Sequence, residues 1–216
     1  MEIIKIDANN PDPKIIKQAV DALILSGAII YPTDTAYGLG VNALDEKVIR
    51  KLYQIKGRDF AKPTHVVVRD WEMINQLCHT NKAAKILYDK FLPGPLTIIL
   101  PKKMCVSDLL TGYLPTLGIR IPDSPITKLL SKLSPFPYTT PSANPSGGLT
   151  PHTINQSLDQ FSDLQKSLID LVLDAGQLAK VDPSTIVDCS VEIPKIIRPG
   201  PISKERIEKA LGVEVQ

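Results

Sequence analysis

The chain has 216 residues, a hydrophobic content of 43% and a net charge of +2, so it is long and apolar enough to bury a substantial core. Nucleic-acid binding requires a concentrated basic face, and so small a net charge gives no support to a nucleic-acid-binding protein. No apolar run approaches the length of a membrane span and the N-terminus lacks a signal-peptide layout, so we expect a cytoplasmic protein that does not enter a membrane.

The first elements in chain order are a short strand, a helix and a buried strand that leads into a polar loop. Residues 1–7 read as a strand, and apolar residues recur at helical spacing over 15–23. The β-branched run Ala28–Tyr31 is typical of a buried strand, and Pro32 ends it. Thr33–Thr35 follow. Polar residues at a strand end are where α/β proteins often bind ligands, although an ordinary turn has the same composition.

The middle of the chain begins with a helix that Asp45 caps, and a cationic loop follows at Lys56–Pro63. Strands and helices then alternate without a regular βαβ rhythm, which favours a mixed sheet over a purely parallel one. The remaining expected strands are 64–69, 96–100, 117–121, 171–173, 185–188 and 195–197, and the remaining helices are 70–77, 81–92, 124–133, 153–161 and 203–211.

Cations form the strongest chemical signal. Lys56, Arg58 and Lys62 lie within seven residues on a glycine-containing loop and could grip a triphosphate, although a solvated basic turn is the usual alternative. Arg120 lies inside an apolar run, and Arg198 directly follows another. A cation near a buried strand needs an anion, supplied either by the protein (for Arg120, Asp123 or Asp188) or by a ligand.

Other patterns carry less weight. Gly38–Ala43 matches G-x-G-x-x-A by letter, but it lies too far from the preceding strand end for a dinucleotide fingerprint. Three dispersed cysteines predict neither a disulfide framework nor a zinc site. The three histidines have no metal-ligand spacing, and we expect them to be exposed or satisfied within the protein: His65, His79 and His152.

Seven motifs occur in the order found in a known family, and the chain resembles the YrdC-like threonylcarbamoyl-AMP synthases over nearly its whole length. It is similar to the short, single-domain form. Lys62 stands where many relatives have asparagine. The motifs are Tyr31–Gly40, Lys56–Arg58 with Lys62-Pro63, Pro93–Thr97, Gly118–Pro122, Pro141–Asn144, Ser184–Asp188 and Arg198–Gly200.

The resemblance implies a single α/β domain over residues 1–216, with a twisted mixed sheet and flanking helices around a deep, positively charged cavity. It implies that L-threonine, bicarbonate (or CO₂) and ATP give threonylcarbamoyl-AMP and pyrophosphate. A downstream transferase would use this product to form N6-threonylcarbamoyladenosine at position 37 of tRNA. Mg²⁺ would be held mainly through the nucleotide rather than by the protein.

Residue roles also follow from the resemblance. Lys56 and Arg58 are the expected catalytic residues. Threonine would be bound by Thr33, Arg120, Thr140 and Ser184. ATP would be bound by Arg58, Lys62, Thr116, Ser142, Asn144, Thr150 and Arg198.

Two alternatives stay open at this point. One is a divergent homologue that keeps the fold but has lost the reaction, against which the intact cationic and serine–asparagine motifs argue. The other is an RNA-binding protein that uses a basic concavity, with weak RNA binding as its activity. The second lacks an aromatic-interleaved basic patch.

Overall fold

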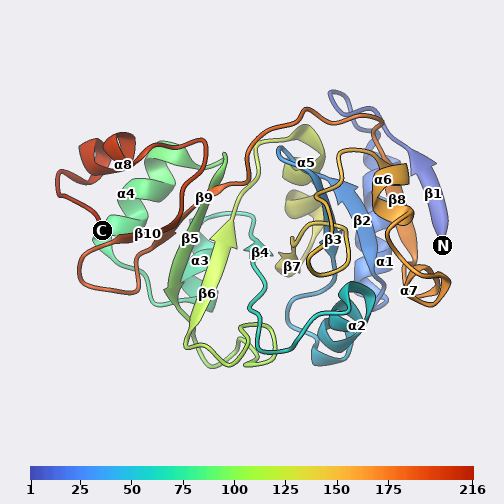
Figure 1. The fold of residues 1–216 in the computed structure, drawn as a ribbon, viewed down its shortest axis with the longest axis horizontal. Helices are drawn as coiled ribbons and strands as arrows, with labels where there is room; N and C mark the ends of the chain where they lie inside the picture. The colour runs from blue at the N-terminus through green and yellow to red at the C-terminus, as the bar shows by residue number, and fades with distance from the viewer.

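The computed structural model describes residues Met1–Gln216 and divides the strands between two mixed sheets. The first has the order β1-β8-β2-β3, and the second has the order β10-β9-β5-β6-β4-β7. Figure 1 shows the second sheet toward the C-terminus with α3, α4 and α8, and the first toward the N-terminus with the other helices. The strands are β1 (Glu2–Lys5), β2 (Ile29–Pro32), β3 (Tyr37–Gly40), β4 (Val66–Val67), β5 (Leu96–Pro101), β6 (Thr116–Arg120), β7 (Tyr138–Thr139), β8 (Leu171–Asp174), β9 (Thr185–Asp188) and β10 (Lys195–Arg198).

Both sheets combine parallel and antiparallel pairs, which confirms the predicted mixed α/β fold. In the first sheet, β8 is parallel to both β1 and β2, whereas β2 and β3 form an antiparallel hairpin. In the second, β5 is antiparallel to β6 and parallel to β9, and β4 is parallel to β6. The antiparallel pairs β4–β7 and β9–β10 form its two edges.

The segment around β7 joins the two sheets. The free side of β3 exchanges backbone hydrogen bonds with this segment: Leu39 N donates to Pro141 O at 2.8 Å, and Ala143 N donates to Tyr37 O at 2.8 Å. β7 itself pairs with β4 of the other sheet. The segment around β7 is therefore held on both sides, and this fixes Ser142 beside Gly38.

Eight helices cover the sheets, and nearly all begin where a polar cap is expected. Asp45, Asp70, Asn81 and Ser124 each accept a backbone N–H of the following first turn. The helices are α1 (Pro13–Ile24), α2 (Glu46–Lys56), α3 (Trp71–Leu77), α4 (Lys82–Phe91), α5 (Pro125–Leu133), α6 (Ile154–Leu158), α7 (Asp163–Ser167) and α8 (Lys204–Leu211). None is long and apolar enough to cross a membrane.

Within the first sheet, β2 and β8 are buried on both faces, as their alternating side chains show. Ile29 and Tyr31 of β2 pack with α1 and α5, whereas Ile30 between them packs with α2 and α6. β8 alternates in the same way, with Val172 on the α2 side. Successive strand residues point to opposite faces, so a strand covered on both sides is apolar throughout. The larger core lies between the second sheet and α3, α4 and α8.

Three short elements were not foreseen: β3, β7 and α7. β3 contains Gly38 and Gly40, and glycine usually weakens a strand prediction. Here the glycines make room for the ring of Tyr31, since a Cβ on Gly40 would lie 2.9 Å from Tyr31 Cε1. The G-x-G letters therefore belong to a hairpin strand and not to a phosphate-binding turn. β4 is also shorter than expected, covering only Val66–Val67.

Candidate active site

One pocket, with a volume of about 330 Å³, lies where the two sheets approach each other. Its walls come from the β2–β3 turn with the start of β3, the cationic loop after α2, the residues just before β4, the end of β6, the segment after β7, the segment that leads into β9, and the end of β10. Three arginines line the pocket, whereas no aspartate or glutamate does. The side chains that matter below are Thr33, Thr35, Arg58, His65, Arg120, Thr140, Ser142, Thr150, Ser184 and Arg198.

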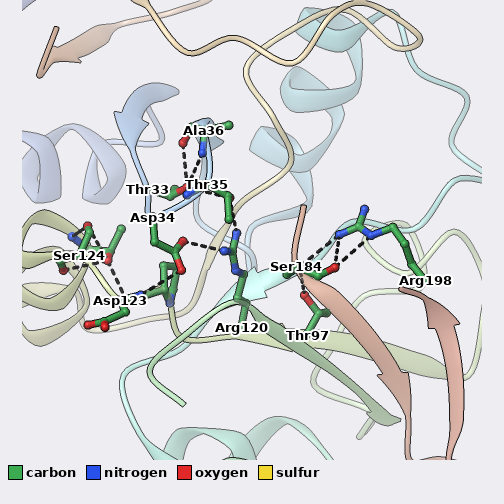
Figure 2. Close-up of polar contacts among 12 residues, drawn as sticks. Thr33, Asp34, Thr35, Ala36, Thr97, Arg120, Asp123, Ser124, Ser184 and Arg198 are labelled. Carbon is green, nitrogen blue, oxygen red and sulfur yellow. Dashed lines mark hydrogen bonds and ion pairs between the residues drawn. The ribbon is translucent and has the colours of Figure 1, made fainter. Parts of the chain in front are cut away.

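The β2–β3 turn is held closed by its own threonine. Thr33 Oγ1 donates to Ala36 O at 2.7 Å and accepts the backbone N–H groups of Thr35 and Ala36, each at 3.2 Å. Figure 2 shows this turn above Arg120. The hydroxyl satisfies the turn in the manner of an ST-motif, so the turn presents Asp34 and Thr35 in a fixed direction.

Arg120 is tied to that turn. Its Nη2 lies 2.6 Å from Asp34 Oδ1, and its Nη1 donates to Thr35 Oγ1 at 3.0 Å (Figure 2). The side chains are only 7% and 12% exposed, so this is a buried ion pair. Asp34 Oδ2 also accepts the backbone N–H of Asp123.

The internal anion that faces Arg120 is therefore Asp34, and not Asp123 or Asp188, the two acids considered from the sequence as possible internal partners. The Asp188 carboxylate instead accepts a hydrogen bond from the Ser190 hydroxyl. Arg120 Nε is buried without a partner. A buried guanidinium N–H without an acceptor is costly, so this donor is available to a ligand.

Arg198 lies on β10, in the same sheet as Arg120, and holds Ser184. Its Nε and Nη2 donate to Ser184 O at 3.1 and 2.8 Å, and Nη2 also reaches Ser184 Oγ at 3.1 Å (Figure 2). Ser184 Oγ in turn hydrogen bonds to Thr97 Oγ1. Burial and the nearby positive charge of Arg120 both lower the pKa of Arg198. Two desolvated cations thus face one cavity, an arrangement that an anionic ligand would stabilise.

The third arginine comes from the cationic loop. Gly57 ends α2 in the left-handed conformation with φ of 53°, which turns the chain so that Arg58 faces the pocket. Arg58 Nη2 donates to Pro63 O at 2.9 Å, and its Nε is buried without a partner. Burial lowers the pKa of this guanidinium as well.

Lys56 does not line the pocket but lies behind it. Its Nζ donates to the carbonyl oxygens of Ser142 and Asn144, both at 2.6 Å, and the residue is only 2% exposed. Burial, with a smaller contribution from Arg58, lowers the pKa of Lys56 from 10.5 to about 7. The lysine therefore braces the segment that carries Ser142 into the pocket.

Eight of the predicted site residues line the same pocket: Thr33, Arg58, Arg120, Thr140, Ser142, Thr150, Ser184 and Arg198. Four others do not. Lys56 and Asn144 are buried behind it, and the Asn144 amide donates to Pro145 O and Gly148 O. Lys62 is exposed on the cationic loop, and Thr116 is half-buried at the start of β6. The ligand roles of all twelve stay predictions.

The sequence interpretation missed Asp34, Thr35 and His65. Asp34 and Thr35 lie in the polar loop that drew attention, but only the fold brings them to Arg120. His65, which was expected to be exposed or satisfied, lines the pocket and makes no side-chain hydrogen bond within the protein. Its place in the expected strand 64–69, directly after the cationic loop, is the feature that could have raised it as a candidate.

His65 should make stability depend on pH. Burial and the charges of Arg198, Arg120 and Arg58 lower its pKa from 6.5 to about 4. Between these values the unfolded chain binds more protons, so the stabilisation is complete above pH 6.5 and is lost as pH falls toward 4. Between pH 7 and pH 4.5, the free energy of unfolding should fall more for the wild type than for His65→Leu. Parallel losses would show that the imidazole is well solvated.

The role of Lys56 as a brace predicts a stability loss. Lys56→Met leaves two buried carbonyls unpaired, so the free energy of unfolding should fall by roughly 1–3 kcal/mol. The amides of residues 142–144 should also exchange faster with solvent. Lys51→Met is a matched control on the same helix, since Lys51 pairs with Asp170 near the surface and its loss should cost less than about 1 kcal/mol. If the two variants lost equal free energy of unfolding, Lys56 would not have this bracing role.

Metal ligands do not gather in this fold. It contains no group of three or more histidine, cysteine, aspartate or glutamate side chains that could hold an ion. Asp34, the carboxylate nearest to the pocket, is already engaged by Arg120. The pocket side chains therefore do not fit a dedicated metal site.

The fold and the pocket define a mixed α/β protein with an arginine-lined pocket where two mixed sheets meet. The family profile for Sua5/YciO/YrdC, described as "Telomere recombination", matches residues 22–200. The chain belongs to this family.

Relatives support the same assignment. A putative threonylcarbamoyl-AMP synthase of Methanocaldococcus jannaschii is 41% identical, with 96% of this chain and 97% of the relative covered. The threonylcarbamoyl-AMP synthase of Bacillus subtilis is 35% identical over 96% of this chain but only 59% of its own length. The crystal structure of Pyrococcus abyssi Sua5 complexed with L-threonine superposes with a TM-score of 0.92 at 31% identity, covering 100% of this chain and 63% of that one.

Proposed function

We propose that this protein is an L-threonylcarbamoyladenylate synthase, which converts L-threonine, bicarbonate (or CO₂) and ATP into threonylcarbamoyl-AMP and pyrophosphate. The observation that supports this most is the convergence of Arg58, Arg120 and Arg198 from separate elements on one pocket. Two of them keep a buried Nε without a partner. Such donors suit a substrate set that carries a carboxylate, a carbamate and a triphosphate.

On the threonine side, we assign Thr33, Arg120, Thr140 and Ser184 as binding residues. Arg120 is the natural partner for the carboxylate, because the β2–β3 turn already fixes its guanidinium. Thr140 Oγ1 is buried and unpartnered, so it can take a polar group of the amino acid. Pyrococcus abyssi Sua5 was crystallised with L-threonine, which supports this substrate for a protein of the same fold.

On the nucleotide side, we assign Arg58, Lys62, Ser142, Thr150 and Arg198 to ATP, with Thr116 and Asn144 at its margin. Asn144 Oδ1 is buried and unpartnered, and a change in the loop on nucleotide binding could satisfy it. Mg²⁺ would be carried by the phosphates of the nucleotide, where it neutralises their charge. The positively charged cavity that we expect rests on these same cations.

The chemistry needs no covalent intermediate with the protein. The neutral amine of threonine attacks the carbon of CO₂ and loses a proton to water, giving a carbamate. A carbamate oxygen then attacks the α-phosphorus of ATP while the bond to the bridging oxygen breaks and pyrophosphate leaves. Arg58 would stabilise the charge that develops on the phosphates, and Lys56 would act through the segment that it braces.

We further propose that residues 1–216 form one such domain and that the protein works in the cytoplasm. Its product is a reactive mixed anhydride, so a transferase that modifies adenosine 37 of tRNA should accept it downstream. The RNA-binding alternative is not favoured, since the relatives are synthases by name and the cations face a small pocket instead of an open face.

Substrate discrimination tests this proposal. Pyrophosphate release should require both threonine and bicarbonate, with serine a poor substrate and valine a very poor one. Valine is nearly isosteric with threonine, but it would leave pocket hydroxyls unpaired, which discriminates far more strongly than a missing methyl. If valine were used as well as threonine, or if release did not depend on bicarbonate, the substrate assignment would be wrong.

A further inference from the structure

His65 is the titratable side chain of the pocket to which the proposed reaction gives no role. It directly precedes β4, and its backbone carbonyl accepts the N–H of Thr140 at 3.1 Å. A Cβ on Gly118 of β6 would collide with the His65 ring at Cδ2, so the imidazole lies directly against the backbone of that strand. Its position is therefore fixed by two strands, while its side chain makes no hydrogen bond to the protein.

Most side chains of the pocket offer a ligand donors, although the hydroxyls of Thr64 and Thr140, which are buried without a partner, can accept as well as donate. Guanidinium groups only donate, and no carboxylate lines the walls. Thr33 Oγ1 makes its hydrogen bonds within the β2–β3 turn, and Thr35 Oγ1 accepts a hydrogen bond from Arg120. Ser184 Oγ is shared between Thr97 and Arg198.

A neutral imidazole differs from all of these groups, because one of its ring nitrogens carries an sp² lone pair. Arg58, Arg120 and Arg198 surround His65 with positive charge, and with burial they lower its pKa to about 4. The ring is therefore neutral at physiological pH, with one nitrogen that accepts. The same positive field disfavours an ammonium ion and favours a neutral amine beside it.

We propose that the His65 imidazole accepts a hydrogen bond from the amino group of the amino-acid substrate. This inference rests on the proposed function. With the carboxylate on Arg120 and an N–H on His65, the amine is held as a neutral group with its lone pair free for carboxylation. His65 forms no covalent bond and takes no proton, so its role is to bind and orient the nucleophile.

A cycle of variants and substrate analogues tests this contact. (R)-3-Hydroxybutanoate has the carboxylate and hydroxyl of threonine but a hydrogen in place of the amine, and L-2-aminobutanoate lacks the hydroxyl. Calorimetric titrations of the wild type should show threonine binding about tenfold or more tighter than (R)-3-hydroxybutanoate. In His65→Leu this difference in affinity should nearly disappear. The difference in affinity between threonine and L-2-aminobutanoate should change little, and so should the affinity for ATP.

His65→Asn and His65→Gln are the matched variants, since each returns an acceptor oxygen near one ring nitrogen, and at least one should restore part of the difference in affinity between threonine and (R)-3-hydroxybutanoate. Equal weakening of threonine and of the amine-free analogue in His65→Leu would overturn the proposal, because the ring would then only shape the pocket. Weaker binding of ATP alone would also overturn it. A wild type that binds no threonine would instead remove the proposed function, before any variant is measured.

A measurement on the unaltered protein covers the case in which the variants do not fold. The chain has only three histidines, so the imidazole ¹⁵N resonances of His65 can be assigned. Threonine should shift the resonance of the accepting nitrogen, whereas (R)-3-hydroxybutanoate should not. Equal shifts with both compounds, or none with threonine, would contradict the contact.

Discussion

Replacing Arg58 with alanine should slow adenylate formation by about 30- to 1000-fold, which corresponds to roughly 2–4 kcal/mol of transition-state stabilisation. The guanidinium is partly desolvated, and its buried Nε has no partner in the protein. A phosphate that meets this donor forms a charge-assisted hydrogen bond in a partly dry site, where it is stronger than at a surface. Steady-state pyrophosphate release gives the rate.

The fold should survive this change, because Arg58 lies in a polar loop and makes one hydrogen bond, to the exposed Pro63. Arg50→Ala provides the control, since Arg50 is an exposed arginine on α2, the helix that leads into the loop. It should change neither the rate nor the melting temperature. Near-normal turnover by a folded Arg58→Ala protein would remove the cationic loop from the mechanism.

Arg120→Lys should weaken threonine binding by about tenfold or more, since a lost bidentate pair costs about 1.5–3 kcal/mol, and it should change ATP affinity much less. A lysine can still pair with Asp34, but its point charge cannot also hold Thr35 and a carboxylate in one plane. Separate calorimetric titrations of threonine and ATP, with melting curves, measure both effects.

The buried pair with Asp34 supplies the competing explanation, in which Arg120 serves only the fold. Asp34→Asn separates the two roles, because it keeps the guanidinium but removes its internal anion. That variant should lose stability while it keeps threonine affinity within a few-fold. If Arg120→Lys lowered the melting temperature and left threonine affinity unchanged, Arg120 would serve only the fold. If threonine and ATP lost affinity equally, the assignment of Arg120 to threonine would be wrong.

Local sequence patterns predicted most of the fold, because caps and periodicity are local properties. Asp45 and Ser124 start helices where expected, and β9 covers the predicted residues 185–188. The way in which two sheets are joined was not predicted, since it depends on β7 pairing with β4 while the residues that flank β7 bond to β3. Such pairings join residues far apart in the chain, as Val66 with Thr139 and Leu39 with Pro141, and no local pattern encodes them.

The candidate site was predicted unevenly for the same reason. Motif order indicated the three arginines, but the partner of Arg120 lies 86 residues away in a turn that could have faced anywhere. Lys56 ends an amphipathic helix, where a lysine is normally solvated, and only the tertiary structure shows it inside the protein. His65 has no spacing signal, so its position against Gly118 could be known only from the paired strands.

The most direct test of the proposed activity follows the carbon from bicarbonate into the product. The purified protein would be incubated with ¹³C-bicarbonate, ATP, Mg²⁺ and threonine, and the adenylate would be analysed by mass spectrometry while pyrophosphate is counted. We expect an adenylate that carries one labelled carbon and one threonine, formed in equal amount with pyrophosphate and absent when threonine is omitted. Unlabelled threonyl-AMP, or pyrophosphate release without any labelled adenylate, would contradict the assignment.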